Sequence, residues 1–173
     1  MAVAAILVAV AVPNMRTFIQ NGRLNTQVND LIGDIVFARS AAIHSAGTPP
    51  SGAGVGICQS INGTTCVVGN WQNGRAVFTD LNNDNDWDAG EPIIRFREPL
   101  PSVNTLAVNG LMPTVISFNV STSSTSKPNV TNVNGGVFVF CDERGQAYGK
   151  QVSLNAMGHP IVSAIPPPTC TPL

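Results

Sequence analysis

The hydrophobic pattern divides the chain into an apolar start, an amphipathic stretch and a long remainder with short apolar runs. Residues 1–12 are small or apolar and carry no charge. From Asn14 to about residue 46, apolar positions recur every three or four residues, which is the spacing of an amphipathic helix. The positions on this stripe are Met15, Phe18, Ile19, Gly22, Val28, Leu31, Ile32, Ile35, Val36, Ala42 and Ile43. Gly47 and Pro49 are expected to end the helix.

A helix of about 45 residues would be near 68 Å long, which is more than a small domain can cover. Its first third therefore has to be buried in a membrane or among neighbouring copies of similar chains. The twelve apolar residues are fewer than the roughly 20 that cross a bilayer. We expect them to be the end of an apolar helix whose front lies upstream of Met1.

After Pro50 the helical period is replaced by short β-rich runs with Gly, Asn and Pro between them, which is typical of antiparallel hairpins. The expected strands are 55–58, 76–79, 93–97, 105–108, 115–120, 137–141, 151–154 and 161–164, and the polar segment 121–136 is expected to be a surface loop. The predicted fold class is α+β, with one long helix packed on an antiparallel sheet. Residues 1–20 form the membrane or filament part of the helix, and 21–173 form a globular domain with helix 21–46 and sheet 51–173.

Composition supports a folded domain outside the cytoplasm. Apolar residues make up 43% of the chain, and charged residues only 11%, against about 25% in ordinary soluble domains. The net charge of -1 excludes a global basic field that would attract nucleic acid or anionic membranes.

The candidate disulfide residues are Cys58, Cys66, Cys141 and Cys170, whose spacing fits no zinc site. Of three possible pairings we favour Cys58–Cys66 and Cys141–Cys170, with four free thiols as the alternative.

An acidic segment places oxygen ligands at positions 1, 3, 5, 7, 9 and 12 of a twelve-residue loop, which is the spacing of a calcium-binding EF-hand loop. The residues at these positions are Asp80, Asn82, Asp84, Asp86, Asp88 and Glu91. Asn85 stands where such loops carry glycine, but asparagine tolerates left-handed backbone. The alternative is an Asx-rich hairpin loop without an ion. Calcium is the only cofactor that the sequence suggests, and we expect the protein to require no cofactor.

Several short motifs together resemble the GspH/FimT group of minor type IV pilins and type II secretion pseudopilins. Residues 4–15 (AAILVAVAVPNM) are similar to the end of the pilin transmembrane helix, and residues 37–42 (FARSAA) to a helix segment of that group. Cys58, Cys66, Trp71, Gly74, Phe78, Asp80 and the pair Gly90-Glu91 follow the order of motifs that is typical of the group. Residues 140–145 (FCDERG) resemble its late strand.

The resemblance implies a structural minor pilin of a type IV pilus that helps to initiate or cap the filament. Its partners would be other pilins or pseudopilins, and the inner membrane before assembly. It would be a single-pass inner-membrane protein with a periplasmic C-terminal domain, and later part of a filament. The residues expected to pack in the filament are Ile6, Leu7, Val10, Pro13, Met15, Phe18 and Ile19. A pseudopilin of type II secretion and a DNA-binding competence pilin are the alternatives.

DNA binding through the known motif of the FimT-type competence pilins is not expected. Those proteins carry Gly-Arg-x-Arg near the C terminus, and here the aligned residues are Gly158-His159-Pro160-Ile161. The remaining candidates for phosphate contacts are Arg95, Arg97, Arg144 and Lys150. Arg95 and Arg97 alternate on one strand and so point to the same side. We find no catalytic motif and expect no enzyme.

Overall fold

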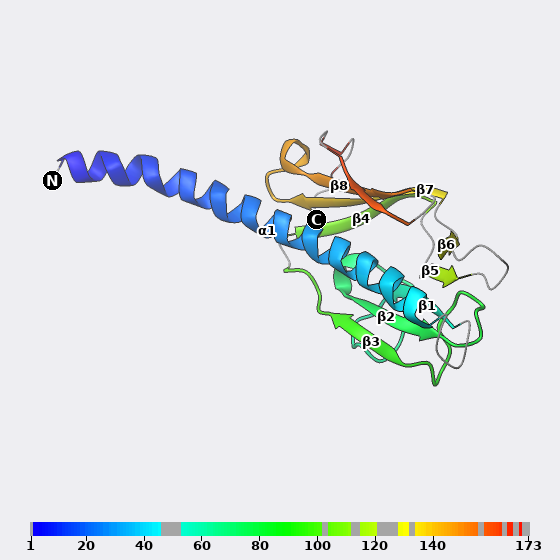
Figure 1. Ribbon diagram of the computed structural model, residues 1–173. Coiled ribbons are helices and arrows are strands. Elements are labelled where there is room, and N and C mark those ends of the chain that lie inside the picture. Colours follow the sequence, from blue (N-terminus) through cyan, green and yellow to red (C-terminus); the bar gives the residue numbers. More distant parts are fainter. Residues whose placement is uncertain are drawn as a thin grey trace.

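The computed structural model describes residues 2–45, 53–101, 104–111, 115–120, 128–131, 134–155, 158–163, 166–167 and 170, while the side chains of residues 2–13, 109–111, 120, 128–131 and 134–135 lie outside the description. Helix α1 (Ala2–Ser45) is continuous over 44 residues. Its first part projects far beyond the sheets, and its second part packs against them (Figure 1). Among the described residues, no helix contains a stretch that is long and apolar enough to cross a membrane.

Two antiparallel sheets follow the helix. The strands among the described residues are β1 (Gly54–Gln59), β2 (Arg75–Asp80), β3 (Ile93–Arg97), β4 (Asn104–Leu111), β5 (Val115–Val120), β6 (Pro128–Thr131), β7 (Asn134–Asp142), β8 (Lys150–Leu154) and β9 (Pro160–Val162). Sheet A has the order β3-β2-β1-β5-β6, and sheet B the order β4-β7-β8-β9. The expected α+β architecture, one long helix packed on antiparallel strands, is therefore confirmed, with two corrections. The strands form two sheets rather than one, and β6 lies within the segment predicted to be a loop.

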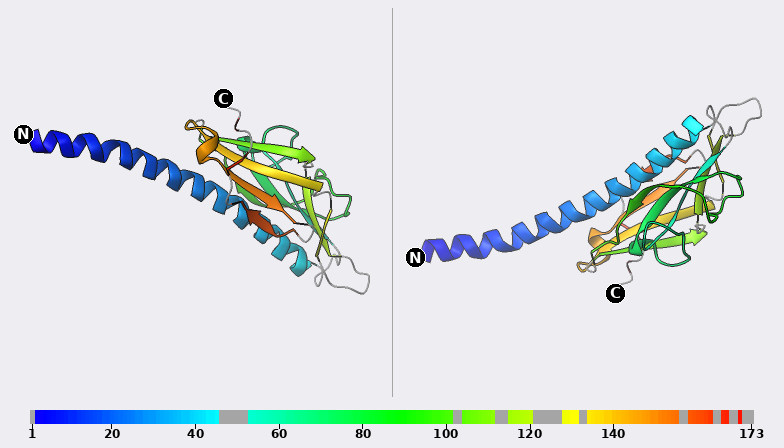
Figure 2. Two further views of the ribbon diagram at one scale, coloured as in Figure 1. Left: turned by 90° about the horizontal axis from the view of Figure 1, so that it is seen from above. Right: turned by 90° about the horizontal axis from the view of Figure 1, so that it is seen from below.

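Helix α1 buries one side against both sheets. Its buried residues are Leu24, Val28, Leu31, Ile35, Ala38 and Ala42, spaced by three or four positions. They share one core with Ile57 and Phe118 of sheet A and with Phe138 and Phe140 of sheet B. The views in Figure 2 show the helix running obliquely across the sheets. The sheets thus cover only part of the helix surface.

The apolar stripe predicted from the sequence was wider than the buried stripe that the structure shows. Val36 and Ile43 were assigned to the stripe, yet they are 53% and 49% exposed. Conversely, Asp34 was not among the residues assigned to the stripe, and it is fully buried. The predicted stripe was too wide because a helix packed on a twisted sheet buries a narrow, curved strip rather than every apolar position.

A second, smaller core lies on the other face of sheet A. It contains Phe78 and Cys58, with Cys66, Trp87 and Phe96 packed against it. Cys66 belongs to the loop after β1, and Trp87 belongs to the acidic loop between β2 and β3. These two loops therefore cover a sheet face that would otherwise expose aromatic rings to water.

Both expected disulfides are present. Cys58 is joined to Cys66 over a sequence separation of 8, and Cys141 is joined to Cys170 over a separation of 29. No free cysteine remains among the described residues. The first bond closes the loop over the small core, and the second ties the chain end to strand β7.

Removing the disulfide that closes the longer loop should destabilise the protein more than removing the disulfide that closes the shorter loop. In the chain-entropy picture, the bond with separation 29 stabilises by roughly 1 kcal/mol more than the bond with separation 8. We expect the double variant Cys141→Ser/Cys170→Ser to unfold at lower denaturant than Cys58→Ser/Cys66→Ser. Denaturant unfolding of the full chain in detergent measures this, and the reverse ranking would contradict it.

Candidate functional site

Large apolar side chains are exposed on α1. Met15, Phe18 and Ile19 are 67%, 77% and 48% exposed, just before the point where the helix meets the sheets. Large apolar side chains with this exposure need a partner surface or a lipid environment. Three of the expected filament-packing residues therefore lie on an open surface. The side chains of Ile6, Leu7, Val10 and Pro13 lie outside the description.

This open side continues along the part of α1 that packs on the sheets. Its members are exposed, uncharged and spaced alternately by four and three residues: Met15, Ile19, Gly22, Thr26, Asn29, Gly33, Val36, Ser40 and Ile43. We call these nine residues the outer helix face. A repeat of four and three is the spacing at which one helix meets another along a seam. At Gly22 and Gly33 an added Cβ would meet no atom within 4 Å.

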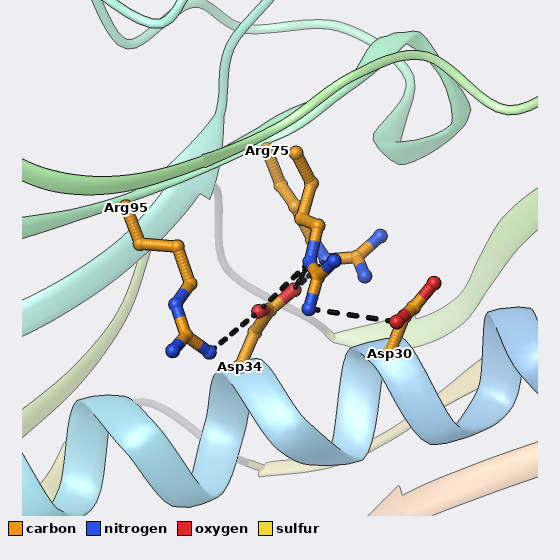
Figure 3. A network of polar contacts seen from close by, with 5 residues as sticks. Asp30, Asp34, Arg75 and Arg95 are labelled. Carbon is orange, nitrogen blue, oxygen red and sulfur yellow. Dashed lines mark hydrogen bonds and ion pairs between the residues drawn. The ribbon is translucent and has the colours of Figure 1, made fainter.

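A buried carboxylate fixes the opposite side of α1 to sheet A. Asp34 is fully buried and receives three arginine side chains from β2 and β3 (Figure 3). Arg75 Nε donates to Asp34 Oδ2 at 2.8 Å, and Arg95 Nη1 lies 3.3 Å from Oδ1. Arg97 Nε donates to both oxygens, at 3.2 and 3.3 Å. One carboxylate therefore joins the helix to two neighbouring strands.

The arginines of this cluster differ in burial. Arg75 is 97% shielded, and burial lowers its pKa while the adjacent Asp34 opposes that shift by favouring the charged guanidinium. Arg95 also lies over the ring of Phe37, with 3.8 Å between its Cζ and the ring centroid. Arg97 makes a second ion pair with Asp30 at 3.4 Å. Three positive charges thus face two negative ones between helix and sheet.

The candidate DNA contacts do not form one surface. Arg95 and Arg97 point to the same side, as expected, but that side faces α1 and its carboxylates. Arg144 follows β7 of sheet B and binds Asp142, with Nη2 2.6 Å from Oδ2. Lys150 begins β8 on sheet B. In the position of the Gly-Arg-x-Arg motif, Gly158 adopts a positive φ of 72° and the chain continues into β9.

The acidic loop is held together by its own side chains. Asp80 is buried and accepts the backbone N–H of Asn83 at 2.6 Å and of Asn85 at 3.0 Å. Glu91 accepts the backbone N–H of Leu81 at 2.7 Å and of Asp88 at 3.0 Å. Asn83 and Asn85 adopt positive φ values of 60° and 69°, which asparagine tolerates. These contacts are those of an Asx-rich turn.

The calcium site predicted for this loop is not confirmed. Within the described part of the chain, no three acidic, histidine or cysteine side chains are arranged to hold a metal ion. Asn82 donates its side-chain amide to Asp84 and Asp88, at 2.9 Å in each case. The loop also carries Trp87 onto the small core, and the indole N–H donates to the Glu91 carbonyl at 3.3 Å. The loop therefore covers the outer face of sheet A.

The fold is similar to that of known minor pilins. A crystal structure of the type IV minor pilin FimU from Pseudomonas aeruginosa aligns with a TM-score of 0.60 and 14% identity, over 89% of this chain and 99% of that chain. A second FimU crystal form aligns with a TM-score of 0.59 and 14% identity, over 86% of this chain and 100% of that chain. At this identity the likeness shows the fold, which is that of the type IV pilins.

Sequence comparison identifies the family. The family described as Type II transport protein GspH matches residues 27–158, and the chain belongs to this family. No curated protein matches the sequence. The expected membership of the GspH/FimT group is therefore confirmed. Minor pilins and pseudopilins are structural components of filaments that assemble from pilin-like subunits.

Asp34 should contribute far more to stability than the neighbouring Asp30. Asp34→Asn leaves Arg75 buried without its counter-charge, and breaking a buried ion pair costs about 3–5 kcal/mol. Asp30→Asn removes a pair that is 39% exposed on both sides, with an expected loss of about 0–1 kcal/mol. Denaturant unfolding of both variants measures the difference. Equal losses would show that Asp34 does not fix the helix.

Asp80 should make stability depend on pH. Burial raises the pKa of Asp80, and Glu91 and Asp84 add to this, so the folded chain keeps the proton longer than the unfolded chain. The stability that this proton provides is complete below about pH 3.9 and is lost as pH rises through the folded pKa. The stability of the wild-type chain minus that of Asp80→Asn should therefore fall between about pH 4 and 7. Denaturant unfolding at both pH values tests this, and a constant or widening difference would oppose it.

Proposed function

We propose that this chain is a structural minor subunit of a type IV pilus and helps to initiate or cap the filament. The observation that carries the proposal is the outer helix face, an exposed and uncharged seam that runs along α1 while the opposite side is fixed to the sheets. A partner helix can approach closely at Gly22 and Gly33, where a side chain is missing. Val36 and Ile43 supply apolar contacts further along.

Apolar burial provides the driving force for this assembly. Full burial of a side chain such as Met15, Phe18 or Ile19 stabilises by about 1.5–3 kcal/mol. Association itself costs about 4–15 kcal/mol in lost freedom of movement, so these residues alone are not sufficient. The rest of the outer helix face has to add to them, because residues 2–12 would leave lipid rather than water and so gain little from apolar burial. This requirement favours packing among several sister helices.

The same surface suggests where the subunit resides before assembly. The apolar start of α1 would lie in the inner membrane, with the sheets in the periplasm, where the two disulfides can form. Transfer from lipid to the filament then exchanges one apolar environment for another. The partner before assembly is the inner membrane, and the partners afterwards are other pilins of the same filament.

The outer helix face can be tested with a variant that leaves the free subunit intact. Gly33→Leu places a side chain in open space and replaces a poor helix former, so the stability of the subunit should be unchanged or higher by up to about 1 kcal/mol. A packed seam has no room for it, so incorporation into filaments should fall at least about tenfold. Phe18→Ser should also reduce incorporation, through lost burial.

Immunoblots of sheared filaments and of whole cells measure incorporation against expression. Ile94→Ser is the matched control, because Ile94 is 40% exposed on strand β3 and lies away from the helix seam. Normal incorporation of Gly33→Leu would refute a role of the outer helix face in assembly. Equal loss in Ile94→Ser would show that exposed apolar residues act without regard to position.

A type II secretion pseudopilus is the second candidate, favoured by the description of the family as a type II transport protein. Both roles use the same helix packing. Deletion of the gene separates them, because loss of pili with normal secretion supports the first role, and loss of secretion with normal pili supports the second. DNA capture is not proposed, because Arg95, Arg97 and Arg144 are each bound to carboxylates.

A further inference from the structure

A polar pocket of about 310 Å³ lies where α1 approaches sheet B. Asn21 and Asn25 line it from the helix, while Tyr148, Gly149 and Lys150 line it from the segment before β8 and from the start of that strand. A hydrogen bond from Arg144 Nη1 to Asn21 Oδ1, at 2.8 Å, holds the helix wall in place. Gly149 lies against Pro167 and Cys170, so the disulfide-bound chain end supports the other wall.

The chemistry of the pocket favours an anion. Lys150 makes no ion pair with any residue that the structure describes, and no acidic side chain lines the pocket. Of the nearby acids, Asp142 pairs with Arg144, and Glu143 is exposed to solvent and accepts a hydrogen bond from Gln20 at 2.6 Å. The amides of Asn21 and Asn25 add neutral hydrogen-bond donors. An ammonium with amide donors is a suitable environment for a phosphate group.

The position of the pocket points to lipid as the source of that phosphate. Phe18 lies three residues before Asn21 and seven before Asn25, which places the three side chains on one side of α1. Phe18 is the most exposed aromatic ring on the helix, at 77%, and Tyr148 at the pocket is 47% exposed. Aromatic rings and lysines gather at the level of lipid headgroups, next to the apolar region.

We propose that this pocket binds the phosphate of a phospholipid headgroup while the subunit is inserted in the membrane, before it joins a filament. This deepens the proposed function and rests on its statement that the start of α1 lies in the inner membrane. Phe18 contacts the acyl chains, and Lys150, Asn21 and Asn25 receive the phosphate about one to two turns further along the helix. The contact fixes how deep the helix is inserted before extraction.

The test uses the full chain in a non-ionic detergent, titrated with dihexanoylphosphatidylglycerol. The side-chain amide signals of Asn21 and Asn25 and the backbone amide of Gly149 should move in a saturable way in nuclear magnetic resonance spectra. Lys150→Ala should weaken binding about tenfold, which is the effect expected for one charge-assisted hydrogen bond. Arg23→Ala is the control, because Arg23 is an exposed cation of the same helix region and lines a different groove.

Each other outcome overturns the proposal. No saturable shift excludes a lipid site, and equal weakening by Arg23→Ala reduces the effect to general charge attraction. Inorganic phosphate or a short DNA duplex that binds at lower concentration than the lipid would assign the pocket to another anion. Gly33→Leu, which lies outside the pocket, should bind the lipid like the wild-type chain while its incorporation into filaments falls, so that failure of the pocket and failure of the assembly proposal can be told apart.

Discussion

The structure depends on one buried carboxylate. Asp34 is the point at which a long helix is joined to a sheet, and it is held by arginines from two adjacent strands. The free energy of apolar burial depends on the area that is buried and not on direction, so by itself it distinguishes only weakly between neighbouring rotations and positions of a helix on a sheet. A carboxylate that binds three guanidinium groups fixes both the rotation of α1 about its axis and its position along sheet A. This contact therefore decides which residues of α1 are covered and which remain open.

The open residues follow from that fixed rotation. With Asp34 turned toward β2 and β3, Gly33 faces open space, while Val36 and Ser40 lie at the side of the helix that borders Pro160 of β9. In the proposed filament, the small and uncharged side chains on that side would face neighbouring subunits. The same rotation brings Asn21 and Asn25 beside sheet B, where the polar pocket forms. Two proposed functions thus derive from a single orientation.

Much of this architecture could be predicted from the sequence. The helix spacing, the β-rich runs and the two disulfide pairs all indicated the observed fold, because each depends on local residue pattern. The burial of Asp34 was missed, although its distance of three residues from Leu31 and four from Ala38 places it on the buried strip. Its partners Arg75, Arg95 and Arg97 lie far away in sequence, and their pairing depends on how β2 and β3 align. The same alignment explains why the arginines chosen for DNA contacts lie against the helix. The pocket was missed for a similar reason, since Asn25 and Lys150 are distant in the chain.

The arrangement around Asp34 also determines how the subunit carries a mechanical load. In the proposed filament, tension would pull each subunit along its helix axis, and part of that force would pass from α1 into the sheets. Arg75, Arg95 and Arg97 hold the same carboxylate side by side, and so they resist that pull together, in shear. Contacts loaded together fail only when all are overcome, whereas contacts loaded in series open one after another. The charged cluster would thus act as the joint through which tension in the filament reaches the folded domain.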